Sequence, residues 1–167
     1  MFYSFEKNSY HTENLLFVAK ALGKNHLSYI HSDGVEIVAT DGHRCHIYTP
    51  PADECPLPKG FYKIIKRTKT KIDILLEQNA DLIFPDYKRI VPNLDGVIPF
   101  KYRSTIYNAF AQVTRALGEG ALNYNYFADT IGADLDCEFK TNGQNVGVLF
   151  KWAYKTAVIM PIIEPEE

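Results

Sequence analysis

The stretch Val35–Pro50 (VEIVATDGHRCHIYTP) constrains the fold of this chain more than any other. Apolar and polar residues alternate up to Ala39 and again over Cys45–Thr49, and a period of two is typical of half-buried β-strands. Between them lies Thr40-Asp41-Gly42, where glycine tolerates positive φ and aspartate can bond its own backbone. The sequence therefore predicts two strands joined by a tight turn. It leaves His43-Arg44 as either a solvated strand end or the lining of a site.

The residues before this stretch extend it to a β-α-β-β-β order. Phe2–Phe5 is typical of a short strand. Thr12 is a good N-cap and Gly23 a natural residue after the C-terminus, so a helix is predicted between them. Leu27–His31 predicts a further strand, which ends at a Ser32-Asp33-Gly34 turn.

The C-terminal part of the chain repeats this order. Ala121–Asn123 indicates a short strand, and Asn125 can cap a short helix that ends at Ile131. Alternation then predicts three strands, around Leu135–Phe139, Val146–Phe150 and Ala157–Met160, with an Asn142-Gly143 hairpin turn after the first and Pro161 after the last. The expected fold class is α+β, with duplicated β-α-β-β-β units whose helices pack on antiparallel sheet.

The middle of the chain is less regular. Lys71–Leu76 and Leu82–Phe84 alternate weakly and favour sheet, whereas Pro58–Ile65 fits either a short helix or the first arm of a hairpin. Phe84–Pro92 is bounded by prolines and predicts an extended connector. Tyr102–Leu117 predicts the clearest helix. Its apolar stripe consists of Ile106, Phe110, Val113 and Leu117.

Composition indicates an ordinary globular protein. With 167 residues, 46% hydrophobic and 23% charged, the chain can bury one core or two very small ones. No apolar run approaches the roughly 20 residues of a membrane span, and the first ten residues do not resemble a signal peptide. Three cysteines without paired spacing suit a reducing compartment. We therefore expect a cytoplasmic protein.

Charge is segregated along the chain. Residues 1–58 carry a net charge of −3, residues 59–118 of +6 and residues 119–167 of −5. Lys59–Lys71 (KGFYKIIKRTKTK) holds six basic residues in thirteen and no acid. Such a run indicates a surface for nucleic-acid phosphates, and a solvated helix or hairpin face explains it equally well.

A metal centre or a catalytic site is less well supported. His43, Cys45, His46 and Cys55 fall within thirteen residues and could suggest zinc. Successive residues of a strand point to opposite faces, however, so Cys45 and His46 cannot both reach one ion. His43 could pass for a base and Asp41 for its orienting group, but no nucleophile stands in a recognisable motif. We expect no metal, no cofactor and no enzyme activity.

Three motifs in register resemble the β sliding clamp of bacterial DNA polymerase III. They are the Ala39–Arg44 turn, the Phe84–Pro92 connector and the Val158–Pro161 ending. The resemblance extends over about half of the residues and fits the middle and last of that family's three domains. It implies a DNA-clamp-like fold in which helices face the hole of a ring, sheets lie outside, and strand edges pair between protomers.

The resemblance also implies a function. Family members encircle duplex DNA without reading its sequence, are not enzymes, and tether polymerases and other replication proteins. Those partners insert a linear motif into a hydrophobic groove. Carried over by position, the groove residues are Thr40, Gly42, His43, Arg44, Cys45, Pro92, Val158 and Met160. The residues expected to face DNA are Lys20, Lys24, Lys63, Lys66, Arg67, Lys69, Lys71, Arg103 and Arg115.

Each group has a simpler explanation. Val158 and Met160 are otherwise core residues, and Pro92 ends a strand. Lys20 and Lys24 can complement a helix dipole without any DNA. The two arginines of the predicted Tyr102–Leu117 helix region, Arg103 and Arg115, can be soluble surface.

The chain departs from the family in two respects. Cys45 stands where family members usually have a larger aliphatic residue, which would enlarge the pocket. The chain is also less than half the usual protomer length. It forms either one reduced domain over residues 1–167 or two half units, about 1–84 and 93–162, joined by residues 85–92. A ring then needs six copies or three.

Three hypotheses follow. The first is a small sliding clamp, a processivity factor that closes as a homo-oligomer around DNA. The second is a non-encircling interaction or regulatory protein that binds replication proteins through the groove. The third, a small hydrolase or metal enzyme built on Asp41, His43 and His46, has the least support.

Overall fold

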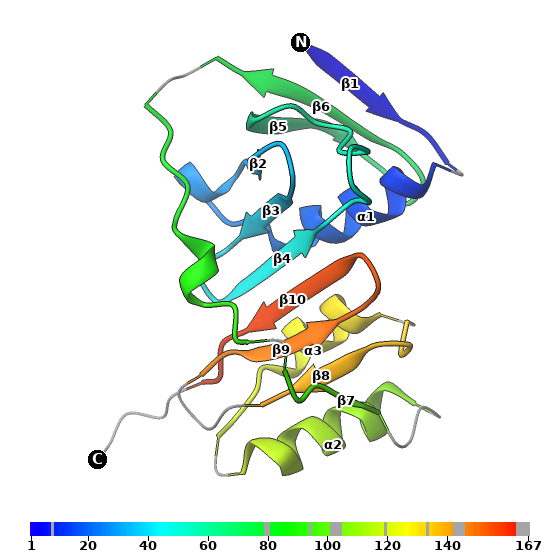
Figure 1. Cartoon of the computed structure of the whole chain (residues 1–167), viewed down its shortest axis with the longest axis vertical. Helices are drawn as coiled ribbons and strands as arrows, with labels where there is room; N and C mark the ends of the chain where they lie inside the picture. Colours follow the sequence, from blue (N-terminus) through cyan, green and yellow to red (C-terminus); the bar gives the residue numbers. More distant parts are fainter. Residues whose placement is uncertain are drawn as a thin grey trace. The chain divides into compact units, whose positions relative to one another are not determined.

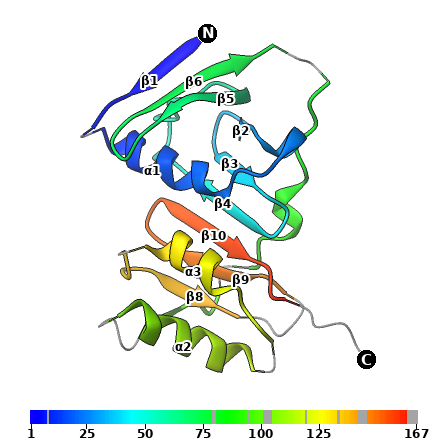
Figure 2. The same ribbon diagram turned by 180° about the vertical axis from the view of Figure 1, so that it is seen from behind.

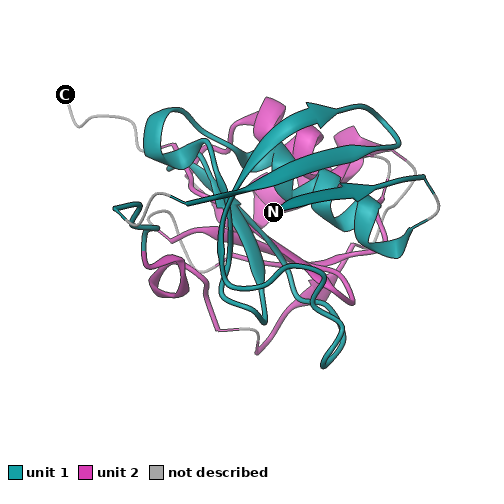
Figure 3. Cartoon of the chain, turned by 90° about the horizontal axis from the view of Figure 1, so that it is seen from above, with its two compact units in different colours: residues 1–85 teal, residues 86–167 magenta. Residues whose placement is uncertain are grey.

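The structure is a computed structural model, which describes residues 1–7, 9–78, 81–93, 95–100, 105–118, 120–132, 134–141 and 146–162. The chain divides into two compact units, residues 1–85 and 86–167 (Figure 3). Within the described residues, no helix is long and apolar enough to cross a membrane.

Unit 1 is an antiparallel sheet with a helix on one face (Figure 1). Its strands follow the order β1-β6-β5-β2-β3-β4. The elements are β1 (Phe2–Phe5), α1 (Tyr10–Val18), β2 (Ile30–Ser32), β3 (Ile37–Thr40), β4 (Arg44–Tyr48), β5 (Gly60–Arg67) and β6 (Ile72–Glu77), with 3₁₀ turns at Ala19–Ala21 and Asn25–Leu27. The β-α-β-β-β order predicted for the first 50 residues is confirmed.

Helix α1 packs on the face of the sheet that carries the even-numbered residues of β4. Phe17 stacks on His46 with ring centroids 4.3 Å apart, and His46 Nδ1 lies 2.8 Å from the Phe17 carbonyl oxygen. His11 Nδ1 lies 2.7 Å from the Tyr48 hydroxyl. Leu15 is fully buried in this layer. The core of unit 1 therefore lies between α1 and this face, which we call the helix face (Figure 2).

The start and end of α1 differ from the prediction. The N-cap residue is Ser9, because Thr12 already lies in the helix and its hydroxyl donates to the Glu6 carbonyl at 2.6 Å. Residues after Val18 tighten into a 3₁₀ turn. The predicted strand Leu27–His31 begins only at Ile30, since a second 3₁₀ turn precedes it.

The segment that fitted either a helix or a hairpin arm is a hairpin arm. β5 pairs with β6 in antiparallel register, and Thr68 N–H donates to the Lys71 carbonyl at 2.9 Å across the tip. A β-bulge lies between Ile64 and Lys66. The bulge interrupts the alternation of the basic run, which is why its sequence pattern did not decide between the two structures.

Unit 2 is a smaller antiparallel sheet with two helices on it (Figure 1). Its strands follow the order β10-β9-β8-β7. The elements are β7 (Ile98–Pro99), α2 (Ile106–Leu117), α3 (Tyr124–Ile131), β8 (Glu138–Lys140), β9 (Val148–Lys151) and β10 (Lys155–Ile159), preceded by a 3₁₀ turn at Tyr87–Arg89. That turn lies inside the connector predicted to be extended.

The predicted β-α-β-β-β order is not repeated in unit 2, because two helices, α2 and α3, lie between its first strand and the next. That first strand is β7, whereas Ala121 forms only an isolated bridge with Ile162. Helix α3 is capped by Asn123 rather than Asn125, because the Asn123 side chain accepts from the Asn125 and Tyr126 N–H groups. The buried stripe of α2 is Ala109, Val113 and Leu117. Arg103 and the Asn142-Gly143 turn lie outside the described residues.

Aromatic side chains fill the core of unit 2. Phe127 of α3 lies edge-on to Phe150 of β9, with centroids 5.6 Å apart. Phe100 stacks on Phe139 of β8 at 4.7 Å. Phe127 and Phe150 are fully buried, so α3 and the sheet share one core.

Candidate functional site

The turn between β3 and β4 is closed by its own side chains. Asp41 Oδ1 accepts from the backbone N–H groups of His43 and Arg44, both at 2.9 Å. The Thr40 hydroxyl donates to the Arg44 carbonyl at 2.7 Å and accepts from Gly42 N–H at 3.1 Å. Gly42 has φ of 90°, a conformation that favours glycine. The predicted turn is confirmed, and its shape is fixed without a ligand.

Two arginines hold the C-terminal end of helix α1. Arg44 Nη2 donates to the Lys20 carbonyl, and Arg67 Nη1 donates to the Ala19 carbonyl at 2.7 Å. Carbonyls at the end of a helix lack intrahelical partners and carry the negative end of the helix dipole. Arg44 and Arg67, which the sequence assigned to a groove and to a DNA surface, therefore stabilise the fold.

The turn also rests against the chain that follows α1. A Cβ built on Gly23 would lie 2.9 Å from the Asp41 Cα, closer than a side chain permits. Arg44 Nε pairs with Asp41 Oδ2 at 3.1 Å, and both side chains are mostly buried. Gly23 follows the C-cap residue Leu22, as predicted, and it also allows this close approach.

Of the predicted groove residues in unit 1, His43 and Gly42 are exposed, Arg44 is half-buried, and Thr40 and Cys45 are buried. Burial, together with the nearby Glu36 and Asp41 carboxylates, raises the pKa of Cys45 to about 12. The Cys45 thiol therefore stays protonated near neutral pH and is not a nucleophile or a ready metal ligand.

Of the predicted groove residues in unit 2, Val158 and Met160 lie at the end of β10, and Pro92 ends the connector. Val158 is fully buried, whereas Met160 and Pro92 are half-buried. A Cβ on Gly147 would clash with the Val158 Cγ1 atom and come within 3.3 Å of the Met160 sulfur and 3.7 Å of the Ile90 carbonyl oxygen. Gly147 thus joins the start of β9, the end of β10 and the connector before Pro92. The sequence alone did not single out Gly147, because a residue without a side chain gives no sign of such a contact.

The predicted groove is therefore divided between the units. The polar half belongs to the β3–β4 turn of unit 1 and the apolar half to the end of β10 in unit 2. A groove that uses both halves stays a prediction.

The arrangement of side chains on β4 argues against the zinc and hydrolase hypotheses. Cys45 pairs with Thr40 and His46 with Ala39, so the two side chains point to opposite faces of β4. His46 is buried against Phe17. No group of three potential metal ligands occurs among the described residues.

The predicted DNA-facing residues that the structure describes come from several elements of the two units. Lys20 and Lys24 lie just after α1, and Arg115 is exposed on α2 in the other unit. Lys63, Lys66 and Lys69 are exposed on the β5–β6 hairpin. Lys71 Nζ pairs with Glu6 at 2.7 Å and with Asp73 at 3.5 Å, and the hydrogen bond to Glu6 raises the pKa of Lys71. These pairs leave Lys71 less available to phosphates than its neighbours.

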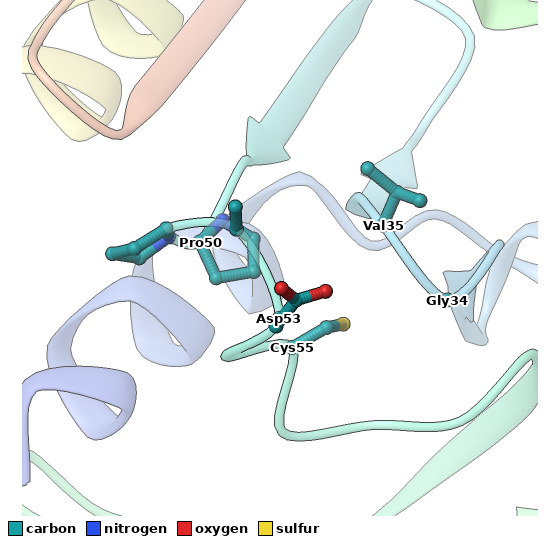
Figure 4. A pocket seen from close by; sticks show the side chains of 7 residues that line it. Gly34, Val35, Pro50, Asp53 and Cys55 are labelled. Atoms are coloured by element: carbon teal, nitrogen blue, oxygen red, sulfur yellow. The ribbon is translucent and has the colours of Figure 1, made fainter.

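A cavity of about 330 Å³ opens at the far end of the β3–β4 hairpin (Figure 4). It is lined by Gly34, Val35, Pro50, Pro51, Ala52, Asp53 and Cys55. Asp53 has φ of 66°, which an aspartate tolerates better than most residues. The Cys55 thiol donates to the Leu57 carbonyl at 3.3 Å. No convergent set of charged groups lines the cavity, so it is a weaker candidate than the turn.

Solved structures with the same fold are sliding clamps. The DNA polymerase sliding clamp from Pseudomonas aeruginosa, solved with a ligand, matches 98% of this chain and 66% of its own, with a TM-score of 0.59 and 15% identity. DNA polymerase III subunit beta from Borrelia burgdorferi, in complex with a natural product, matches 98% of this chain and 64% of its own, with a TM-score of 0.61 and 16% identity. The chain has the fold of the bacterial β sliding clamps.

The clamp fold extends over nearly the whole chain. The beta subunit from Thermotoga maritima matches 99% of it, with a TM-score of 0.54 and 13% identity. The chain spans about 66% of the length of the clamps it matches. No protein-family model matches the sequence, and no curated protein matches it. The clamp-like α+β fold predicted from three short motifs is confirmed.

Proposed function

We propose that this clamp-fold protein is a replication accessory factor that associates with DNA and tethers partner proteins through a peptide groove. The observation that carries the proposal is the likeness to DNA polymerase sliding clamps over 98% of the chain. The proposal includes no enzyme activity. Burial of Cys45 and His46 agrees with that, because neither side chain could meet a substrate.

The proposed groove combines a polar turn with an apolar strand end. The turn offers the exposed His43, and the strand end offers Met160, whose flexible thioether adapts to different apolar side chains. An extended peptide with apolar anchors suits such a groove, since a few polar groups fix its position.

Each unit is proposed to correspond to one reduced clamp domain. Strand β1, at one end of the sheet of unit 1, pairs with β6 alone among the described strands, and β7, at one end of the sheet of unit 2, pairs with β8 alone. Edge strands with unpaired backbone groups are commonly covered by another chain, and closed cyclic symmetry covers them all. Six such domains would require three copies of this chain.

The experiment is a peptide titration. A fluorescent peptide that carries the clamp-binding motif of a bacterial replicative polymerase is titrated with the protein. Met160→Ala is expected to weaken binding about tenfold, which corresponds to ~1.4 kcal/mol. Val35→Ala is the matched control, because it shortens an exposed apolar side chain at the opposite end of the β3–β4 hairpin. Absence of peptide binding at high micromolar concentration would refute the groove.

A non-encircling regulatory protein is the second candidate. One observation favours it: among the described residues of α1, α2 and α3, Arg115 is the single lysine or arginine. Light scattering separates the candidates, since a ring of three has three times the mass of the 19.0 kDa chain. Peptide binding by a monomer that is not retained on circular DNA would support the second candidate.

A further inference from the structure

The sheet face of unit 1 that lies opposite α1 carries a row of lysines. Paired residues of antiparallel strands share a face. Lys63 pairs with Leu75, which pairs with Phe2, and Lys66 pairs with Asp73. The neighbouring pairs, such as Ile64 with Ile74, belong to the helix face. We call the surface formed by Phe2, Lys63, Lys66, Asp73 and Leu75 the open face.

The β-bulge determines which basic residues point outward. In a regular strand Lys66 would follow Ile64 onto the helix face, because side chains alternate with a period of two. The extra residue Ile65 shifts this alternation, so that Lys66 joins Lys63 on the open face. The same shift turns Arg67 towards α1, where it binds the Ala19 carbonyl. The bulge therefore separates a structural arginine from two outward lysines.

Two carboxylates of β6 share the open face with these lysines, Asp73 and Glu77, which pairs with Phe61. Asp73 is buried, accepts from the Ser4 hydroxyl at 2.6 Å and pairs with Lys71. Lys69 is exposed at the hairpin tip between two exposed threonines, Thr68 and Thr70. The open face and its tip thus present three exposed ammonium groups beside hydroxyl donors.

The described helices offer no comparable surface. Among their residues, Arg115 is the single lysine or arginine, whereas α1 carries Glu13 and α3 carries Asp129. A protein that binds DNA by neutralising phosphates needs several cations on one surface. The β5–β6 hairpin, by contrast, carries three exposed lysines, Lys63, Lys66 and Lys69.

We propose that the open face, through Lys63, Lys66 and Lys69, binds the phosphate backbone of duplex DNA without reading its sequence. The proposal rests on the proposed DNA association and names the surface responsible for it, the sheet rather than the helices. Lysines are flexible point charges, which suits phosphates spaced every ~3.4 Å along each strand in any register. Acidic polypeptides are the competing class, because Phe2 and Leu75 are also exposed on this face.

The experiment measures the affinity of the full chain for a labelled 30-base-pair duplex at several salt concentrations. Lys63→Glu/Lys66→Glu is compared with Lys24→Glu/Arg115→Glu, which changes the net charge equally at exposed positions outside the open face. We expect the first variant to bind at least tenfold more weakly and to lower the slope of log Kd against log salt by about 1–2. The second variant is expected to bind within twofold of wild type.

The outcomes separate this inference from the proposed function. If only Lys24→Glu/Arg115→Glu weakens binding, DNA binds to a surface other than the open face. The inference is then wrong, while the proposed association with DNA stands. If polyglutamate displaces DNA at equal charge concentration, the open face is a site for acidic polypeptides and the inference is also wrong. If the wild type binds the polymerase peptide but no DNA at 50 mM salt, the inference fails and the groove survives. Equal melting temperatures of the two variants guard against a folding artefact.

Discussion

The two units hold their helices by different means. In unit 1 the C-terminal end of α1 is held by Arg44 and Arg67, which lie 24 and 48 residues away from their carbonyl partners. In unit 2 the N-termini of α2 and α3 are held by the adjacent caps Thr105 and Asn123. Residues with an apparent functional role in unit 1 are therefore also structural. Loss of binding after a change at Arg44 is uninformative unless stability is measured too.

The largest expected effect is at Arg44. Arg44→Ala removes the bond to the Lys20 carbonyl and the pair with Asp41, and it leaves the mostly buried Asp41 carboxylate without its cation. We expect a loss of about 3 kcal/mol in the free energy of unfolding, measured by urea denaturation. His43→Ala, at the exposed neighbouring position, is the control and should change stability by less than about 0.5 kcal/mol. A loss below about 1 kcal/mol at Arg44 would show that the helix end does not depend on it.

Gly147 provides a matching test in unit 2. The Cβ of Gly147→Ala would meet the Val158 and Met160 side chains, so overpacking should cost roughly 1–3 kcal/mol. Gly42→Ala is the contrasting variant, because a Cβ there meets nothing within 4 Å and only the positive φ is unfavourable. Near-UV circular dichroism should change for Gly147→Ala and not for Gly42→Ala. An unperturbed spectrum and stability for Gly147→Ala would contradict the close packing at the end of β10.

The local caps of unit 2 should have smaller effects. Asn123→Ala removes the acceptor for two backbone N–H groups and is expected to cost about 1 kcal/mol. Asn125→Ala, two residues later and exposed, should cost only a few tenths of that amount. Thermal unfolding of both variants measures the difference. Equal losses would mean that the cap is shared or absent.

The smallest expected effect is a pH dependence in unit 1. Burial lowers the pKa of His31, against an opposing effect of Asp33 and with a further decrease from Lys59. His31 stacks on Phe84 with centroids 4.8 Å apart, and its Nδ1 has no hydrogen-bond partner among the described residues. The unfolded chain then binds a proton more readily than the folded one. The contribution of neutral, buried His31 to the free energy of unfolding is therefore present above about pH 6.5 and is lost as the pH falls below that value.

Melting temperatures between pH 5 and 8 test this dependence. His31→Leu should lose less stability on acidification than the wild type, whereas His26→Leu, at an exposed position, should behave like the wild type. Identical pH profiles for all three proteins would show that His31 does not cause the pH dependence of stability.

Local chemistry made part of the fold predictable. The Asp33-Gly34 and Asp41-Gly42 turns follow from side chains that bond their own backbone, as Asp33 does to Val35 N–H at 2.8 Å. Long-range contacts were not predictable in the same way. Nothing in the sequence around Arg67 indicates that a bulge turns it towards Ala19, because the alternation fails at that position.

The elements that carry the candidate site were predictable, but the contacts of its residues were less so. The turn and the strand end were located correctly, but the uses of Arg44 and Gly23 depend on residues more than fifteen positions away. Gly147 has no side chain to mark its contact with Val158. A glycine that is needed for close packing has no side chain to indicate the contact, so only a structure reveals it.

The central proposal is that one partner peptide contacts both His43 and Met160. A double-mutant cycle with His43→Ala and Met160→Ala on the polymerase peptide tests it most directly. Each single change should weaken binding about five- to tenfold, and the two effects should couple by at least ~0.5 kcal/mol, as expected for residues that share one ligand. A wild-type affinity for His43→Ala, or strict additivity of the two changes, would contradict a groove shared by the two units.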